Sequence, residues 1–510
     1  MIDTEDSISF RESTSSFNDT KQLYRWVILE KLYNPFGFTI LGLLSVLVSW
    51  IVLSGGLEAG VAILVCALGI PVGLICLFNT KLGFIITLVA SSFIFILPRI
   101  TGLYDLPVGS LPDILLLLTF CGLFINRENR FTEVTAYRSP IFYIIIIWIC
   151  YLFSQGINPN SISVSAWLLS VRGIISYTLT YFVLIRLFDC FRDVKLFTIC
   201  WLFIALLAAA YAGYQEFVGL PGYDLAWVQR SPKSIGLNFI RGRWRKWSFL
   251  SDPATFGMFM SFAGVFSTVM AVETEKAKHK VIFIGLSLVF ITVMTYSGTR
   301  TAVAMTVAGI ALYGVLTIHR KNTLVLGAFT AAVILVILYV PYYGSATINS
   351  VRSTFSPSDD ASFNVRVANK ERIQPYLRSH PIGGGINTTG ALGESLAPGH
   401  PLAGFPPDSY YMNIALETGW IGLVICTLLF FVVLAVGIIN YARCNDPKIK
   451  AMYAAYIASF FALTVAGYAQ ESINQLPMRF VFYGCFALMD RLQYFDRTLY
   501  PGENLPTLSR

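Results

Sequence analysis

The residues best suited to chemistry in this chain form a short basic run. Residues 241–246 read Arg-Gly-Arg-Trp-Arg-Lys, so four cations lie within six positions. These cations are Arg241, Arg243, Arg245 and Lys246. Guanidinium groups offer phosphate oxygens paired, permanently charged donors. The run therefore predicts a site for an anionic group, with anchoring to anionic lipid headgroups as the alternative. Trp244 and Trp247 suit either an interfacial anchor or a sugar-stacking surface.

Seven further ionisable residues lie inside or at the ends of long apolar segments, where charge is expensive and suggests function. They are Asp113, Arg172, Glu216, Arg300, Glu417, Glu471 and Arg479. On the spans given below, all lie within about two helical turns of one membrane face. Plainer interpretations exist: Arg172 can pair with Asp113, and charges near span ends are often interface anchors. Arg300 lies in a very tight turn, which favours a functional role.

The composition indicates which elements position these charges. Of 510 residues, 55% are hydrophobic and only 13% are charged, and the mean hydropathy is +0.64. Soluble domains carry about 25% charged residues, so much of this surface must face lipid. The expected fold is an all-α polytopic membrane protein. The net charge of +8 comes largely from basic membrane-flanking turns, so no nucleic-acid partner is expected.

A helix that crosses a bilayer needs about 20 apolar residues, and windows of that size indicate about fourteen spans. Their limits are 36–54, 58–78, 82–98, 108–125, 140–154, 167–188, 194–218, 254–272, 279–297, 301–317, 323–342, 410–440, 451–467 and 477–492. Lys and Arg concentrate in the turns on one side, whereas the turns at 55–57, 155–166 and 468–476 have none. The positive-inside rule makes the basic side cytoplasmic and predicts that both termini lie there.

The predicted segments follow this topology. They are a disordered cytoplasmic tail at 1–33, transmembrane helices 1–11 at 34–342 with a basic outer loop at 219–253, a large outer loop at 343–409, transmembrane helices 12–14 at 410–492, and a cytoplasmic tail at 493–510. Within the large loop, residues 364–374 predict a surface helix that Pro375 ends within a turn. No Cys or His pair has metal-ligand spacing, so no metal or other cofactor is expected.

The second half of the large loop contains two motifs. Residues 378–387 read Arg-Ser-His-Pro-Ile-Gly-Gly-Gly-Ile-Asn. Residues 407–419 read Pro-Asp-Ser-Tyr-Tyr-Met-Asn-Ile-Ala-Leu-Glu-Thr-Gly. The glycine run lacks the Gly-Lys-Ser/Thr ending of a nucleotide-binding loop, and no strand precedes it. In isolation it predicts only a tight turn.

Together these pieces resemble the O-antigen ligase and O-antigen polymerase superfamily. The matching pieces are Arg172, residues 248–257, Arg300, Arg366, His380 and Glu417, followed by Gly419 and Gly422. The resemblance implies a C-class glycosyltransferase fold in the inner membrane of a bacterium. It also implies transfer of glycans from undecaprenyl-pyrophosphate carriers at the periplasmic face, with inversion and without a metal.

The resemblance assigns the candidate residues to roles. Arg172, Arg300 and the run 241–246 are expected to stabilise the pyrophosphate leaving group. The remaining predicted substrate-binding residues are Arg366, His380 and Glu417.

One departure from the family concerns the base. Ligases of this family carry a His-Asn pair nine residues before the Glu of the second motif, and Asp408-Ser409 take that place here. Asp408 is the candidate base toward the acceptor hydroxyl, with His400 as helper or substitute and His380 as a second possible substitute. A helix N-cap is the alternative role for Asp408.

The departure favours a polymerase of undecaprenyl-pyrophosphate-linked repeat units over a strict ligase. A ligase that transfers the glycan to lipid A-core or another acceptor remains an alternative. A lipid-linked oligosaccharide flippase or exporter would need charges through the full membrane depth. Peptidoglycan polymerases of similar topology and lipid-to-protein glycan transferases are further rivals. The expected partners are the lipid-linked glycan, a glycan or lipid acceptor, and the bilayer, with a chain-length regulator as a further candidate.

Overall fold

The computed structural model describes residues 35–102, 104, 108–125, 139–240, 242–339, 346–352, 354, 361–407 and 409–499. The longer helices are α2 (Pro35–Phe78), α3 (Thr80–Phe93), α5 (Leu111–Ile125), α6 (Pro140–Ser154), α7 (Val164–Leu187), α8 (Phe191–Phe217), α11 (Pro253–Glu273), α12 (Ala277–Met294), α13 (Arg300–Leu316), α14 (Lys321–Tyr339), α16 (Ala361–Ser379), α18 (Tyr410–Arg443), α19 (Pro447–Ala466) and α20 (Met478–Leu499). The shorter helices are α4 (Ile96–Thr101), α9 (Gly222–Val228), α10 (Pro232–Asn238), α15 (Ala346–Arg352) and α17 (Gly390–Leu396). Single 3-10 turns are η2 (Val108–Ser110), η4 (Gln155–Ile157), η5 (Thr295–Ser297) and η7 (Ser472–Asn474).

The expected all-α membrane class is confirmed. Among the described residues, nine helices are long and apolar enough to cross a bilayer, and four shorter apolar helices accompany them. Every predicted span overlaps a helix. The number fourteen is not confirmed, because several of these helices are too short or too polar to count as crossings by themselves. The described part of the sheet is one hairpin, β1 (Phe239–Ile240) and β2 (Arg243–Trp244).

The chain divides into two compact units, residues 1–74 and 75–510. The described part of the first unit belongs to α2, which is interrupted at Gly56 (φ 66°, ψ −155°). A positive φ costs glycine little, so the chain can turn there between two apolar segments. The two predicted spans 36–54 and 58–78 are therefore the two halves of α2.

Several helices of the second unit start with the same signal, a Ser or Asp followed by Pro. The starting residues are Ser139, Ser231, Asp252 and Asp446. Each side chain accepts a hydrogen bond from a backbone N–H of the first turn, which the helix itself leaves unpaired. The proline at the next position has no N–H to satisfy and is preset for the helix.

The core of the second unit surrounds α11, which packs against α12, α13 and α19. Gly309 lets α13 approach closely, since a Cβ there would lie 2.8 Å from the side chain of Val265. On another side of α11, Trp201 meets Phe266 edge-on at a ring-centroid distance of 5.1 Å. The Trp201 indole N–H donates to the Tyr456 hydroxyl at 3.1 Å. A helix that is apolar all round, as α11 is, belongs in such a central position.

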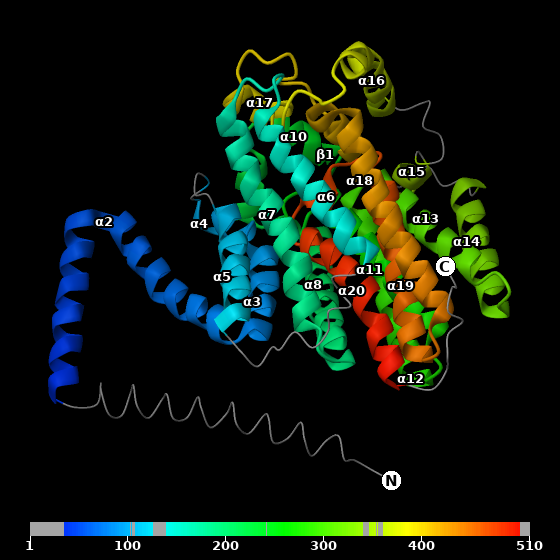
Figure 1. Ribbon diagram of the computed structural model, residues 1–510, viewed down its shortest axis with the longest axis horizontal. Coiled ribbons are helices and arrows are strands. Elements are labelled where there is room, and N and C mark those ends of the chain that lie inside the picture. The colour runs from blue at the N-terminus through cyan, green and yellow to red at the C-terminus, as the bar shows by residue number, and fades with distance from the viewer. Residues whose placement is uncertain are drawn as a thin grey trace, which may run out of the picture. The chain divides into compact units, whose positions relative to one another are not determined.

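The loop segments of the second unit gather at one end of its helices. Figure 1 shows α10, β1, α16 and α17 at the upper end, whereas α20 finishes at the lower end. We call the end that carries residues 219–253 and 361–407 the loop end, and the other the opposite end. The predicted surface helix is present as α16, and Pro375 lies in its last turns, as predicted.

The predicted span 410–440 is helical but contains a break. Gly419 has φ 71° and ψ −170°, which separates residues 410–418 from residues 420–443. The first part belongs to the loop end, and the second is long enough to cross a bilayer. The break is invisible in hydropathy because both sides are apolar and helix-forming.

Candidate functional site

The basic run folds onto the turn between α12 and α13. The Arg243 Nη2 donates to the carbonyl of Tyr296 at 3.1 Å. The Arg245 Nε donates to the carbonyl of Ser297 at 2.7 Å, and its Nη2 donates to the Thr299 hydroxyl at 2.8 Å. Gly298 adopts φ 62°, the left-handed conformation that makes this turn tight. The structure thus brings the run to the turn that ends at Arg300.

The charge of Arg245 lies within range of Arg300. Burial lowers the pKa of the Arg245 guanidinium to about 10, the Asp252 carboxylate raises it, and the positive charge of Arg300 lowers it. Like charges held close together disfavour their charged forms unless an anion joins them. The pair is therefore a place where a bound anion would be stabilised.

Glu216, at the end of α8, is shared by two cations of the run. Its carboxylate lies 3.5 Å from Lys246 Nζ and 3.9 Å from Arg243 Nη1. Burial lowers the pKa of Lys246, Glu216 raises it, and Arg243 lowers it. One carboxylate therefore offsets two cations only in part.

A second group of charges lies around Asp113, near the start of α5. Its Oδ1 accepts from Arg479 Nη2 at 2.6 Å and from the Ser176 hydroxyl at 2.7 Å. Its Oδ2 lies 3.3 Å from Arg172 Nε, so the pairing considered from the sequence is present. Arg479 is buried, whereas the Arg172 side chain is 52% exposed. Arg172 is the member that a ligand can reach.

A short polar chain connects the two groups. Gln475 Oε1 accepts from the hydroxyls of Ser251 and Thr255, each at 2.7 Å. Its backbone carbonyl accepts from the N–H of Arg479 at 2.9 Å. Asp252 lies between those two hydroxyls and caps α11, and its negative charge raises the pKa of Arg245. The start of α11 therefore ties the basic run to the Asp113 group.

Arg99 was not predicted from the sequence, yet it holds the backbone that follows the basic run. The side chain is 3% exposed, its Nη1 donates to the carbonyl of Ser248 at 3.0 Å, and its Nη2 donates to the carbonyl of Leu250. It pairs with Asp224 at 3.5 Å and lies over the ring of Trp227 at 4.6 Å. An arginine at the end of an apolar segment looks like an interface anchor, so only its burial reveals this role.

The two tryptophans beside the basic run differ in position. Trp247 is completely buried and packs against Trp227, with ring centroids 5.4 Å apart. Trp244 lies on β2 and packs against the exposed Phe239 at 4.8 Å. Only Trp244 is therefore placed to meet lipid or sugar.

The glycine run of the large loop crosses the end of the first part of α18. The N–H groups of Gly384 and Gly385 donate to the carbonyls of Leu416 and Glu417, each at 2.9 Å. These carbonyls are ones that a helix end leaves without partners. A Cβ on Gly419 would lie 1.9 Å from the carbonyl oxygen of Pro381. The glycine run therefore forms a turn and also brings its backbone into close contact with the backbone of α18.

Glu417 is buried and fastens the loop to this crossing. Its Oε1 accepts from the Thr389 hydroxyl at 2.7 Å, and the backbone N–H groups of Asn387 and Thr389 also donate to it. The Asn387 amide in turn donates to the Ser170 hydroxyl at 2.7 Å. Because Ser170 lies on α7 two residues before Arg172, Glu417 helps to hold the loop against the part of α7 that carries Arg172.

The two loop histidines are engaged in the structure of the loop. His380 stacks on Tyr376 at a centroid distance of 4.0 Å, and its Nδ1 hydrogen-bonds the Ser379 hydroxyl at 2.8 Å. His400 is buried, and its Nδ1 accepts from the N–H of Leu402 at 3.1 Å. Burial lowers the pKa of His400, although a hydrogen bond to the backbone of Asn160 raises it. The proposed base role of His400 stays a prediction.

Three predicted site residues are not placed. Asp408 and Arg241 lie outside the described residues, and only the backbone of Arg366, on α16, is described. The described residues include no cluster of three or more His, Cys, Asp or Glu side chains that could hold a metal ion.

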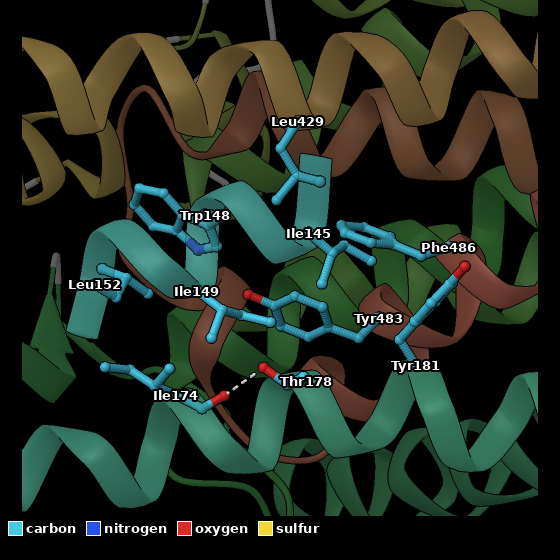
Figure 2. A pocket seen from close by; sticks show the side chains of 10 residues that line it. All are labelled: Ile145, Trp148, Ile149, Leu152, Ile174, Thr178, Tyr181, Leu429, Tyr483 and Phe486. Atoms are coloured by element: carbon cyan, nitrogen blue, oxygen red, sulfur yellow. Dashed lines mark hydrogen bonds between the residues drawn. The ribbon is translucent and has the colours of Figure 1, made fainter. Parts of the chain in front are cut away.

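An apolar pocket lies between α6, α7, α18 and α20 (Figure 2). Its lining includes Trp148, Ile174, Leu429 and Phe486. Ile174 follows Arg172 by two residues on α7, and side chains at this spacing point to opposite sides of a helix, so the pocket is separate from the Asp113 group.

These features define a multi-pass helical membrane protein with a cation-rich polar site at its loop end. Residues 284–427 match the family model described as O-antigen ligase, which confirms the resemblance to the O-antigen ligase and polymerase superfamily. The matched residues contain Arg300 and the two loop motifs, whereas Arg172 and the basic run lie before them. A search of curated proteins finds no match to the chain.

Proposed function

We propose that the chain polymerises glycan repeat units carried on undecaprenyl pyrophosphate, at the membrane face where its loop end lies. An acceptor hydroxyl oxygen attacks the anomeric carbon of the donor glycan from the side opposite the pyrophosphate. The bond between that carbon and the pyrophosphate oxygen breaks, and its electron pair leaves with the pyrophosphate. The hydroxyl proton passes to a base, and the configuration inverts.

One observation carries the proposal: the basic run is hydrogen-bonded to the turn that ends at Arg300. This turn lies near the start of the residues that match the family model. The leaving pyrophosphate gains negative charge as the bond breaks. Preorganised cations at that position stabilise the transition state more than the ground state. Arg172, Arg245 and Arg300 are the cations to which we assign this role.

We assign the base to Asp408, which directly precedes Ser409, the N-cap of α18. Ser409 already accepts a hydrogen bond from the N–H of Met412, so capping does not require Asp408. His400 is the second candidate.

A ligase remains the second candidate function, because the matching family is described as O-antigen ligase. The Asp408-Ser409 pair, in place of His-Asn, favours the polymerase. We also propose that the loop end is periplasmic, that both termini are cytoplasmic, and that a chain-length regulator is a partner. Labelling of an Arg243→Cys variant by an impermeant thiol reagent in intact cells tests the sidedness; protection there would contradict it.

The function is tested with the full chain in proteoliposomes supplied with an undecaprenyl-pyrophosphate-linked oligosaccharide. A ladder of products that differ by one repeat unit is expected without any other acceptor. Transfer of single units only to added lipid A-core would establish the ligase, and no transfer to either acceptor would overturn both. Asp408→Asn is expected to stop transfer while the donor still binds; full transfer by this variant would leave Asp408 without a role as base.

A further inference from the structure

The β1–β2 hairpin projects apolar side chains outside the spanning helices. Phe239 and Ile240 on β1 are each 42% exposed, and Leu237 just before it is 58% exposed. The strands pair antiparallel with Phe239 opposite Trp244, and Gly242 (φ 78°) helps to form the turn. A soluble surface would not normally gather such large apolar side chains at a loop tip.

This apolar tip continues a lipid-facing stripe on α8. Exposed apolar residues recur along α8 at helical spacing and end at its last residue. They are Leu196, Ile199, Phe203, Leu207, Tyr214 and Phe217. The Phe217 ring meets Tyr296 at a centroid distance of 6.2 Å, and Arg243 of the hairpin donates to the Tyr296 carbonyl. Direct contacts therefore connect the exposed apolar stripe of α8 to the β1–β2 hairpin.

The cations of the hairpin region lie at the boundary of this apolar surface. Arg243 pairs in register with Ile240, and Lys246 shares Glu216 with Arg243. Glu216 immediately precedes Phe217, the last residue of the stripe. Apolar side chains bordered by long cations and a tryptophan are the pattern of a segment that lies in a membrane interface.

We infer that the β1–β2 hairpin docks into the surface of the lipid bilayer at the loop end, with Phe239 and Ile240 among the acyl chains and Arg243 at the level of the lipid phosphates. The continuity with the α8 stripe selects lipid as the occupant, because a protein partner would have to cover the stripe as well. The docking does not depend on the glycosyl transfer proposed above. It also accounts for cations in a loop that the positive-inside rule would leave neutral, since they flank an inserted apolar tip.

The test uses the full chain in nanodiscs that contain anionic phospholipid. Ile240→Cys is labelled with an environment-sensitive fluorophore, and Leu392→Cys on α17, 52% exposed, is the matched control in the large loop. The parent chain, treated identically, measures labelling of the native cysteines. Spin-labelled lipids are expected to quench the label at 240 more strongly than aqueous iodide does, and the order is expected to reverse at 392.

Stronger quenching by iodide than by spin-labelled lipid at position 240 would overturn the docking. Leu237→Cys provides a second exposed position on the same tip if Ile240→Cys does not fold. Lipid quenching at 240 that persists in neutral nanodiscs would support insertion by the apolar tip. Its loss there would show that the docking needs anionic headgroups, and would still place the hairpin on lipid.

Discussion

The ion pairs at the loop end and at the opposite end are built in opposite proportions. At the loop end, one carboxylate serves two cations: Asp113 with Arg172 and Arg479, and Glu216 with Arg243 and Lys246. At the opposite end, cations meet at least as many carboxylates: Lys81 with Asp189 and Asp193, and Arg320 with Glu273. In these pairs cations outnumber carboxylates at the loop end, although Arg99 and Asp224 pair one to one there.

We interpret the opposite-end charges as structural and assign the loop-end cations to a ligand. The opposite-end cations are already neutralised by their carboxylates, since Arg320 Nη1 lies 2.7 Å from Glu273, and they need no further anion. At the loop end, Arg172 is half exposed and shares its carboxylate with the buried Arg479. A pyrophosphate would complete the neutralisation there, and this is the physical basis of the proposed function.

The largest effect is expected from removing a cation that we assign to the leaving pyrophosphate. Arg172→Ala and Arg300→Ala should each lower transfer by about 100-fold or more, the usual loss for one preorganised charge donor. Arg320→Ala at the opposite end is the matched control and should change transfer little. Initial rates with the lipid-linked oligosaccharide in proteoliposomes measure this. Equal losses in all three variants would remove the distinction between the two ends.

The next effect concerns the shared carboxylate. Asp113→Asn should destabilise the chain by about 3 kcal/mol, because it leaves Arg479 as a buried cation without its anion. Asp189→Asn at the opposite end should cost about 1 kcal/mol or less, since that side chain is 45% exposed and Lys81 keeps Asp193. Thermal or denaturant unfolding in one detergent compares the two. A larger loss for Asp189→Asn would contradict the contrast.

Arg99 sharpens the contrast, because it lies at the loop end but is fully matched. Arg99→Lys keeps the charge and loses the fork that reaches the carbonyls of Ser248 and Leu250, so stability should fall by about 2 kcal/mol. Arg230→Lys is the control and should cost about 1 kcal/mol or less, because Arg230 lies over the ring of Tyr104 at 3.8 Å and a lysine can also make this cation–π contact.

Unfolding and the Michaelis constant for the lipid-linked donor are measured together. If Arg99 positions the run, Arg99→Lys raises that constant even at temperatures where the variant is fully folded. An unchanged constant at such temperatures would limit Arg99 to stability.

The smallest effect is a pH dependence of the large loop. Burial lowers the pKa of His400, so the unfolded loop takes up a proton at a pH where the folded loop does not. The stability is therefore complete above about pH 6.5 and falls below it, by at most about 1.4 kcal/mol per pH unit. Hydrogen exchange of the loop amides between pH 7 and pH 5 measures this loss.

His400→Gln should flatten the pH dependence of the loop stability, whereas His319→Gln at the opposite end should leave that dependence as it is in the parent chain. A steep profile that survives in His400→Gln would assign the dependence to another group.

The positions of the helices follow from local sequence, whereas the site does not. Apolar windows and Ser-Pro or Asp-Pro starts, such as Asp252-Pro253, mark where helices lie because these signals act within one turn. The sharing of Asp113 by two arginines depends on Arg479, which is 366 residues away. Likewise, the burial of Arg99 and Trp247 is decided by packing, so the sequence assigned no role to Arg99 and suggested an interfacial anchor or a sugar-stacking surface for Trp247.

The break in α18 shows the same limit. Gly419 lies in a continuous apolar stretch, and its positive φ and the close crossing by Pro381, which explain why a glycine is needed there, are seen only in the fold. The pairing of Arg172 with Asp113 was considered from the sequence and is present, because both were placed near one face by the span limits. Depth along a span can be predicted from sequence, but contact between spans needs the fold.

The central claim, that the surplus charge at the loop end binds a lipid pyrophosphate, is tested most directly by an affinity measurement. Undecaprenyl pyrophosphate without a glycan is titrated into nanodiscs that hold the full chain, its Arg172→Gln, Arg300→Gln double variant, or its Arg320→Gln variant. The account predicts that the double variant loses at least about tenfold in affinity, a change of about 1.4 kcal/mol, while Arg320→Gln binds as the parent does. Equal affinity in all three would contradict it.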